Sequence, residues 1–175
     1  MLEVNGAKMS GSGTIVCYAV SIATLLNEPL HLFNIRAKRS KPGLRPQHLS
    51  AVRACARMCG GQLDGAFEGS SEIYYYPGEK IRGGNYKFNI GTAGSTTMFV
   101  LTILPISLFA DSRVEVEITG GLAQDFAPTP FHVNNVLFHV LDMMGVHARL
   151  DVLRWGYYPR GCGTIRFFVD PVKKL

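Results

Sequence analysis

The first half of the chain alternates short apolar runs with longer segments of helical period. The segment from Thr14 to Leu26 is apolar nearly all round, which predicts a helix buried on most of its faces. The segment from Pro46 to Cys59 repeats its apolar positions every three or four residues, and Arg53 and Arg57 fall on its wet side. The short runs predict strands at Leu2–Val4, Leu30–Ile35, Gln62–Leu63 and Glu72–Tyr76.

The second half of the chain shows the same pattern again. In Val114–Thr119 apolar and polar residues alternate, which is typical of a strand with one wet face. Gly91–Ser95 leads into an apolar segment, and Pro130 precedes another. The pattern predicts strands at Tyr86–Ile90, Val114–Thr119, Ala148–Leu153 and Thr164–Val169, and helices at Thr96–Phe109 and Phe131–Met144.

The two halves therefore predict a duplicated unit. Pro46 and Pro130 are 84 positions apart, and Gly60 and Gly145 are 85 positions apart. A repeat of this length is a whole α+β unit and not a turn of a solenoid. We expect an α+β fold of two tandem βαβαββ units, residues 1–80 and 81–175, each a four-stranded sheet covered on one face by two helices.

Composition is that of a folded protein with a local excess of positive charge. Of the 175 residues, 47% are hydrophobic and 18% charged, which excludes a disordered chain. The net charge is +5, and the stretch between Glu28 and Asp64 holds seven Lys or Arg, two His and no acid. This block favours an anionic partner such as a nucleic acid or nucleotide, with simple solubility as the alternative.

The positive charge is densest in the segment Ile35–Leu49. It contains Arg36, Lys38, Arg39, Lys41 and Arg45, with a Pro42-Gly43 turn among them. A helix then begins at Pro46, with Gln47 and His48 in its first turn. Helix amides and arginine forks both attract phosphate oxygens, so the segment predicts a phosphate site. A solvated basic loop is the alternative.

The four cysteines and the apolar runs predict neither a metal centre nor a membrane anchor. Cys17, Cys55, Cys59 and Cys162 form no CxxC pair, and we expect them to be small buried residues. Charged residues interrupt the start of the chain, and Gly or Pro breaks each long apolar run, so we expect no leader and no membrane span. A cytoplasmic protein is expected, or a nuclear one in a eukaryote.

The segment IRAKRSKPGLRPQHL resembles the corresponding stretch of the RNA 3'-terminal phosphate cyclases, which carry an IRAGR…KPGL…QHL pattern. Three further places agree: Arg82-Gly83-Gly84, the run Gly91–Pro105 and Gly156-Tyr157-Tyr158-Pro159. The resemblance covers nearly the whole chain. It implies the unit described above, which the enolpyruvyl transferases share. The cyclases have three such units, with a small domain inserted in the third, and we expect only two here.

The resemblance implies a chemistry and a set of binding residues. The cyclases transfer AMP from ATP to a histidine and then to an RNA 3'-phosphate, which cyclises onto the neighbouring 2'-hydroxyl. By resemblance, Arg36, Arg39, Gln47 and His48 line the nucleotide and phosphate pocket, and Pro128 packs against adenine. Charge and position add Arg45 to the predicted anion site. The resemblance allows ATP and a divalent metal as cofactors.

Several positions depart from the family pattern. The cyclases' EGGGQ entry is Ser10–Thr14 here, a following arginine is Cys17, and a glutamine of the second apolar helix is Leu101. Two glycine turns read Gly120-Gly121-Leu122 and Gly161-Cys162-Gly163. The nucleophilic histidine belongs to the third unit, and its motif matches none of His31, His48, His132, His139 and His147. We therefore expect no catalytic residue in this sequence.

Three functions remain open on these residues. The chain binds an RNA 3' end or a nucleotide without completing the reaction, or it forms part of an ATP-dependent cyclase completed by another chain, or it is a non-catalytic RNA-processing scaffold. We favour the first. Because two units of a three-unit architecture leave apolar surface uncovered, we also expect a homodimer or a partner chain, and no membrane partner.

Overall fold

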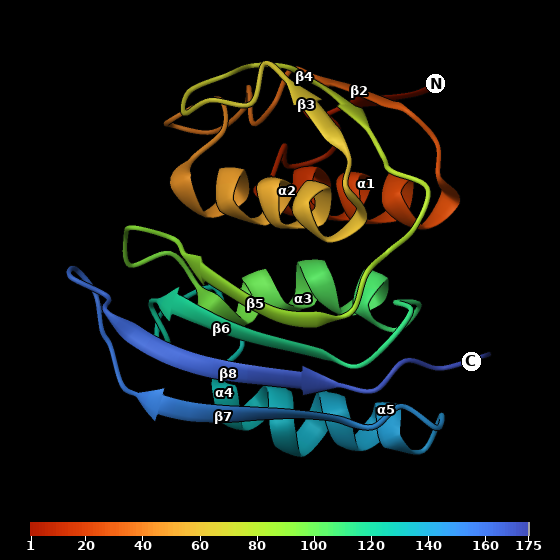
Figure 1. Cartoon of the computed structure of the whole chain (residues 1–175). Helices are drawn as coiled ribbons and strands as arrows, with labels where there is room; N and C mark the ends of the chain where they lie inside the picture. The colour runs from red at the N-terminus through yellow and green to blue at the C-terminus, as the bar shows by residue number, and fades with distance from the viewer. Residues whose placement is uncertain (175) are drawn as a thin grey trace. The chain divides into compact units, whose positions relative to one another are not determined.

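Each half of the chain folds into a four-stranded sheet with helices against one of its faces (Figure 1). The computed structural model describes residues 1–174. The first unit spans Met1–Ile81 and the second begins at Arg82. The predicted α+β class, with two tandem βαβαββ units, is confirmed.

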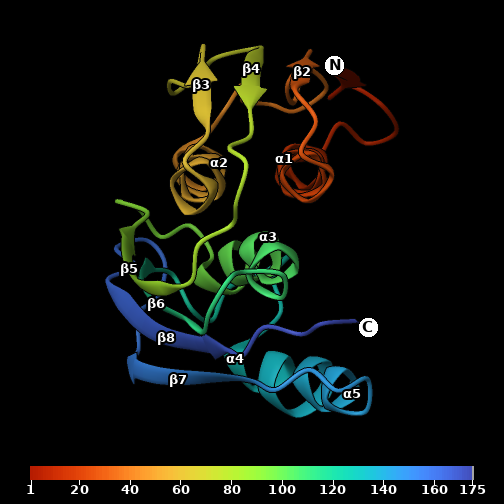
Figure 2. The same ribbon diagram turned by 45° about the vertical axis from the view of Figure 1, so that its right-hand side comes forward.

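Unit 1 places two helices side by side on one face of its sheet, as Figure 2 shows along the helix axes. The strand order in the sheet is β1-β2-β4-β3. Strands β1 and β2 are parallel, and β4 runs antiparallel to β2 and β3 on either side of it. The elements are β1 (Leu2–Asn5), α1 (Gly13–Leu26), β2 (Leu30–Phe33), α2 (Pro46–Cys59), β3 (Gln62–Asp64) and β4 (Ile73–Tyr76).

The bounds of α2 follow from its end residues. Pro46 occupies the first helical position, where the missing N–H costs nothing. Gly60 ends the helix in the left-handed conformation, with φ of 70°, which glycine adopts without strain. The sequence predicted both ends of this helix correctly.

The core of unit 1 lies between its helices and its sheet. Val20 of α1, Val52 of α2 and Leu32 of β2 are all fully buried there. Tyr75 is also buried, and its hydroxyl lies 2.7 Å from Thr24 Oγ1 and 3.1 Å from Cys59 Sγ. The phenol thus has polar partners inside the core, which removes the cost of burying it.

Unit 2 has the same topology with longer strands. Its order is β5-β6-β8-β7, with β5 parallel to β6 and β8 antiparallel to both of its neighbours. In β6, the apolar residues that alternate with Glu115 and Glu117 are buried, as the sequence predicted. The elements are β5 (Gly84–Asn89), α3 (Thr96–Ser107), β6 (Val114–Gly120), the helical segment α4 (Pro130–His132), η1 (Val133–Phe138) and α5 (His139–Asp142), β7 (Ala148–Arg154) and β8 (Gly163–Val169).

The last helical segment departs from regular α geometry. Its middle part, Val133–Phe138, is π-helical, between short α-helical pieces. Within it the Asn134 side chain donates to Leu150 O at 2.6 Å and accepts from Leu150 N at 3.0 Å. This pair fastens the helical segment to β7.

One expectation about burial was confirmed with an exception, and another was wrong. Helix α1 is buried or half-buried over most of its surface, as expected, but Tyr18, Ile22 and Leu26 are 41%, 51% and 59% exposed and form an apolar stripe. The stripe follows a spacing of four residues, which places its members on one side of the helix. Cys162 is exposed, whereas Cys17, Cys55 and Cys59 are buried as expected. Within residues 1–174, no helix has both the length and the apolar character needed to cross a membrane.

Candidate anion-binding site

The basic segment between β2 and α2, residues 36–45, is a loop held by backbone hydrogen bonds. Gly43 N donates to Ile35 O at 2.9 Å, which closes the loop on itself. Leu44 N donates to Ser70 O at 2.9 Å, and Gly69 N donates to Leu44 O at 2.8 Å. A Cβ at Gly43 would overlap the backbone of Gly69, so the two segments approach closely. The loop therefore presents its cations from a fixed frame.

Arg36 belongs to that frame. Its guanidinium donates through one nitrogen to Gly43 O at 3.0 Å and to Lys41 O at the turn. Its backbone has φ of 52°, in the left-handed region that a residue other than glycine rarely adopts. Burial, and then the charges of Arg39 and Arg45, lower the pKa of Arg36. The positive charge of Arg36 is thus disfavoured by burial and by two neighbouring cations.

Arg45 connects the loop to α2 and is partly neutralised. Its guanidinium lies 3.0 Å from the carboxylate of Glu68, and both side chains are substantially exposed to solvent. An exposed pair of this kind contributes at most about 1 kcal/mol, so an anion of higher charge can compete with Glu68 for Arg45. Glu68 thus gives the site a weak internal counter-ion.

His48 lies in the first turn of α2 and is neutral at physiological pH. Burial, and then the charges of Arg36 and Arg45, lower its pKa from 6.5 to about 4. Its Nδ1 accepts from Arg45 N at 3.4 Å. A neutral imidazole that accepts at Nδ1 carries its proton on Nε2. Because a Cβ added to Gly13 would overlap that nitrogen, the donor is directed at the start of α1.

The start of α1 and the basic loop are joined by one side chain. Lys38 Nζ donates to Met9 O at 3.1 Å, and a Cβ at Gly11 would come within 3.2 Å of Lys38 Cβ. Ser12, the residue that precedes α1, makes no side-chain cap. The glycine-rich entry, the basic loop and the first turn of α2 are therefore assembled in one unit.

A shallow pocket of about 330 Å³ lies beside this entry. Its walls are mostly apolar, and Tyr18 supplies an aromatic ring. The lining residues are Met9, Ser10, Ser12, Thr14, Ile15 and Tyr18.

The predicted site residues are distributed over both units. Arg39 is exposed in the basic loop, and Gln47 is partly buried as the second residue of α2. Pro128 belongs to unit 2, where its carbonyl accepts from Thr97 Oγ1 at 2.7 Å. Five of the six, Arg36, Arg39, Arg45, Gln47 and His48, thus occur together in unit 1.

The substituted positions remove charge from this region. Cys17 is 4% exposed, and the pKa of Cys55 is raised by burial and by the neighbouring thiols of Cys17 and Cys59. A compact thiol thus stands where the resemblance would place a guanidinium. Ser10 is exposed and brings no carboxylate to the entry. Among residues 1–174, no three His, Cys, Asp or Glu side chains are grouped to hold a metal ion. The donors at this site are cations and amides, which suit an anion.

Three residues of the site were missed by the sequence analysis. Glu68 pairs with Arg45 across a chain separation of 23 residues, and no local pattern marks such a pair. Gly13 and Lys38 were noted only as parts of a glycine-rich entry and a basic run. The signal available for Gly13 was its position at the start of a predicted helix, where the absence of a side chain lets another residue pack closely.

Comparisons with known proteins agree with the pattern in the sequence. The model of the RNA 3'-terminal phosphate cyclase family matches residues 8–175. A protein of Methanopyrus kandleri named RNA 3'-terminal phosphate cyclase is 41% identical over 175 residues, which are 100% of this chain and 49% of the relative. Proteins of the same name from Staphylothermus marinus and Caldivirga maquilingensis are 41% and 38% identical, over 98% and 100% of this chain and 48% and 49% of their own. The chain thus spans about half the length of these curated relatives.

Proposed function

The chain belongs to the RNA 3'-terminal phosphate cyclase family, and we propose that its unit 1 binds the phosphate of an RNA 3' end or of a nucleotide through the basic loop. The observation that carries this proposal is the basic loop, which carries Arg36, Arg39 and Arg45 directly before the first turn of α2 and is held by its own backbone hydrogen bonds. Burial, and then the charges of Arg39 and Arg45, lower the pKa of Arg36, and a bound anion would offset that repulsion.

The residues divide the work of binding between them. Arg36 holds the loop through its carbonyl contacts, which leaves Arg39 and Arg45 to meet phosphate oxygens. His48, neutral and protonated at Nε2, offers a hydrogen bond without adding charge. The amides at the start of α2 complete an environment for an anion. ATP is the nucleotide that the family relation suggests.

These 175 residues by themselves bind but do not cyclise in this proposal. None of the five histidines matches the motif of the family nucleophile, and the acid, arginine and amide of the family pattern are Ser10, Cys17 and Leu101. Binding a ground state without a nucleophile gives no covalent step. In the alternative proposal, a partner chain supplies the nucleophile and the reaction is completed in the complex.

The exposed stripe of Tyr18, Ile22 and Leu26 supports association with a partner or a second copy. Unit 2 has further exposed apolar side chains on its last helical segment and directly after it, where Val136, Val140 and Met143 are 48%, 51% and 79% exposed. Apolar surface of this kind tends to be covered in proteins.

The proposal is tested by comparing oligonucleotides that end in a 3'-phosphate and in a 3'-hydroxyl. We expect tighter binding of the phosphorylated end, measured by fluorescence anisotropy, and a loss of affinity as salt is raised. Arg39→Ala should weaken binding of the phosphorylated end about tenfold or more, since hydrogen bonds to charged groups contribute about 1.5–3 kcal/mol. Arg113→Ala, an equal loss of charge from unit 2, is the matched control. Equal affinity for the two ends would contradict the proposal.

A further inference from the structure

Three exposed aromatic rings lie near one another where the loop after β7 meets α4, and the exposed Tyr158 follows them in sequence. Trp155, Tyr157 and Tyr158 come from the loop between β7 and β8, residues 155–162, and are 40%, 58% and 80% exposed. Phe131, 62% exposed, comes from α4. The Trp155 and Tyr157 rings are stacked at 6.3 Å with 12° between their planes, and Phe131 lies 5.6 Å from Trp155. We call these four residues the aromatic patch.

The loop that carries the patch is fixed by its own backbone. Gly161 N donates to Tyr157 O at 2.7 Å, and the Arg154 Nε donates to Cys162 O at 2.7 Å across the base of the loop. Leu122 N donates to Gly156 O at 3.1 Å and ties the loop to the segment after β6. A Cβ at Gly156 would overlap the backbone of Gly163, so the two arms of the loop touch. The rings are thus presented from an ordered frame, which lowers the entropy cost of binding.

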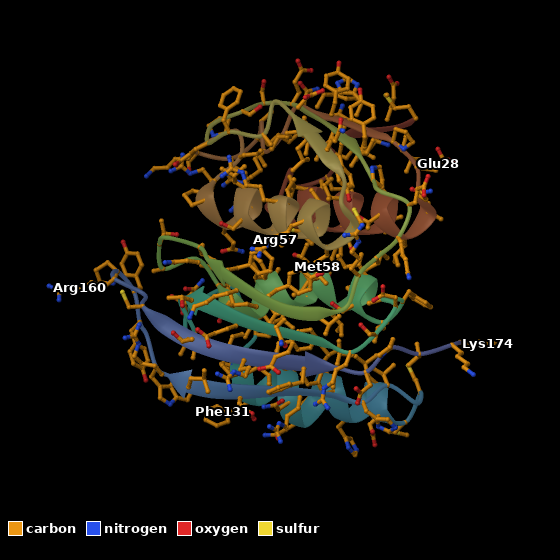
Figure 3. All side chains as sticks on the ribbon, viewed as in Figure 1. Glu28, Arg57, Met58, Phe131, Arg160 and Lys174 are labelled. Atoms are coloured by element: carbon orange, nitrogen blue, oxygen red, sulfur yellow. The ribbon has the colours of Figure 1, made fainter. Side chains whose placement is uncertain are left out.

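The loop that carries the aromatic patch has cations and no acid in its sequence. It contains Arg160 and follows Arg154, the last residue of β7, and the sequence has no acidic residue from Val152 to Val169. Figure 3 shows Arg160 at the outer tip of the loop, pointing away from the body of unit 2. Arg154 uses its Nε for the loop itself. Exposed rings interleaved with arginines are the combination that single-stranded nucleic acids require, because bases stack on the rings and phosphates meet the guanidinium groups.

We propose that the aromatic patch binds the bases of single-stranded RNA, with Arg154 and Arg160 contacting its phosphates. The choice of RNA as the nucleic acid rests on the proposed function. The bases that stack here belong to the body of the strand, so binding at the patch does not depend on a terminal phosphate. An aromatic surface could also cover a protein partner, and the absence of acidic residues in this stretch favours the nucleic acid.

Trp155 makes the test direct, because it is the only tryptophan of the chain. An oligoadenylate of about eight nucleotides, within the site sizes of single-strand binders, is given a 3'-hydroxyl end so that the anion site in unit 1 has no terminal phosphate to bind. We expect saturable quenching of the tryptophan fluorescence at low salt. Lack of quenching at saturating oligonucleotide would overturn the proposal.

Substitutions then assign the site. Tyr157→Ala combined with Tyr158→Ala should weaken binding about tenfold or more, because each base stacked on an aromatic ring contributes about 1–3 kcal/mol and about 1.4 kcal/mol is a factor of ten. Both side chains are largely exposed, and Trp155 remains as the reporter. Phe109→Ala is the control, since Phe109 is 44% exposed just beyond the far end of α3. Unchanged affinity in the double variant refutes the patch as the site.

The two proposals fail separately in this design. Variants of the patch should weaken oligonucleotides with either 3' end by the same factor, whereas Arg39→Ala should weaken only the phosphorylated one. If the double variant abolishes self-association in sedimentation and leaves oligonucleotide affinity unchanged, the patch is a protein interface and the RNA assignment is wrong. If Arg39→Ala has no effect and the patch variant does, the anion site fails alone.

Discussion

The imidazole of His48 occupies the space in which a side chain at Gly13 would lie. A Cβ built at residue 13 would overlap Nε2 and the two ring carbons of His48 beside it. The first turn of α2 therefore packs directly against the first residue of α1, and the two helix starts form one structural element of unit 1.

We predict that Gly13→Ala destabilises the protein by about 1–3 kcal/mol, the usual cost of forcing extra atoms into a packed site. The measurement is the free energy of unfolding in urea. The double variant Gly13→Ala with His48→Ala should recover much of the loss relative to His48→Ala alone, because the overlapping ring is gone. Additive effects in this cycle would show that the two residues do not meet.

We predict that His48 makes the protein less stable in mild acid. Its folded pKa of about 4 lies below the 6.5 of an exposed histidine, so the unfolded state binds the proton more tightly. The free energy of unfolding contributed by neutral His48 is nearly complete above pH 6.5 and declines as the pH falls. At pH 5 it is about 2 kcal/mol smaller. His48→Gln should remove this share of the change in unfolding free energy between pH 7 and pH 5. An unchanged difference in His48→Gln would contradict this prediction.

We predict that Arg36 and Arg39 have separable roles. Arg36→Ala should lower stability by about 1–2 kcal/mol, because two carbonyls of the loop lose their donor. Arg36→Lys keeps the charge but not the planar fork, and it should restore little of that stability. Arg39→Ala should leave the unfolding free energy unchanged within about 0.5 kcal/mol, as exposed substitutions usually do. Thermal and urea unfolding distinguish these outcomes. If Arg39→Ala were destabilised, Arg39 would help to hold the loop, as Arg36 does.

We predict self-association through the stripe of Tyr18, Ile22 and Leu26. Analytical ultracentrifugation at micromolar concentration should show a species larger than the 19.2 kDa chain. Ile22→Glu places a charge in the middle of the stripe and should return the protein to a monomer. Phe109→Glu, a charge introduced at another exposed apolar residue, should not. A wild-type monomer at every concentration contradicts this prediction.

We predict that the 175 residues form no adduct with AMP. Incubation with α-labelled ATP and a divalent metal should leave the protein unlabelled, because no residue matches the family nucleophile. His48 is the nearest alternative, but its ring is packed against Gly13 and Arg45 N. An acid-labile labelled band that disappears in His48→Ala would show that His48 acts as the nucleophile.

The periodicity of apolar residues predicted the fold well because local signals agree with the tertiary structure. Pro46 and Gly60 fix the ends of α2, and the alternation in β6 matches its two faces. The π-helical stretch Val133–Phe138 was not predicted, since its extra residue per turn follows from packing and not from the apolar pattern. The exposed side of α1 was also missed, because hydrophobicity all round a helix does not tell which side finds a neighbour.

The candidate site could be predicted only in part. The run of cations and the helix start at Pro46 indicated where an anion would bind. The sequence did not reveal that Arg36 binds carbonyls of its own loop, or that Arg45 pairs with Glu68. Both contacts depend on the fold of segments that are not local to the basic run, and they change which arginine is offered to a ligand. The aromatic patch was visible only as a fragment of a family pattern, because Phe131 joins it from another element.

Because three of the four thiols are buried, Cys162 is the one cysteine that a thiol reagent can reach in the folded protein. Burial keeps Cys55 protonated, since its pKa is raised, and Cys17 and Cys59 are shielded beside it, whereas Cys162 is open to reagents. Only a thiolate that a reagent can reach is alkylated, so a maleimide dye should attach once per folded molecule. That dye would be attached in the loop that carries Tyr157 and Tyr158, so a change in its fluorescence would test whether an oligonucleotide binds there, without any engineered cysteine.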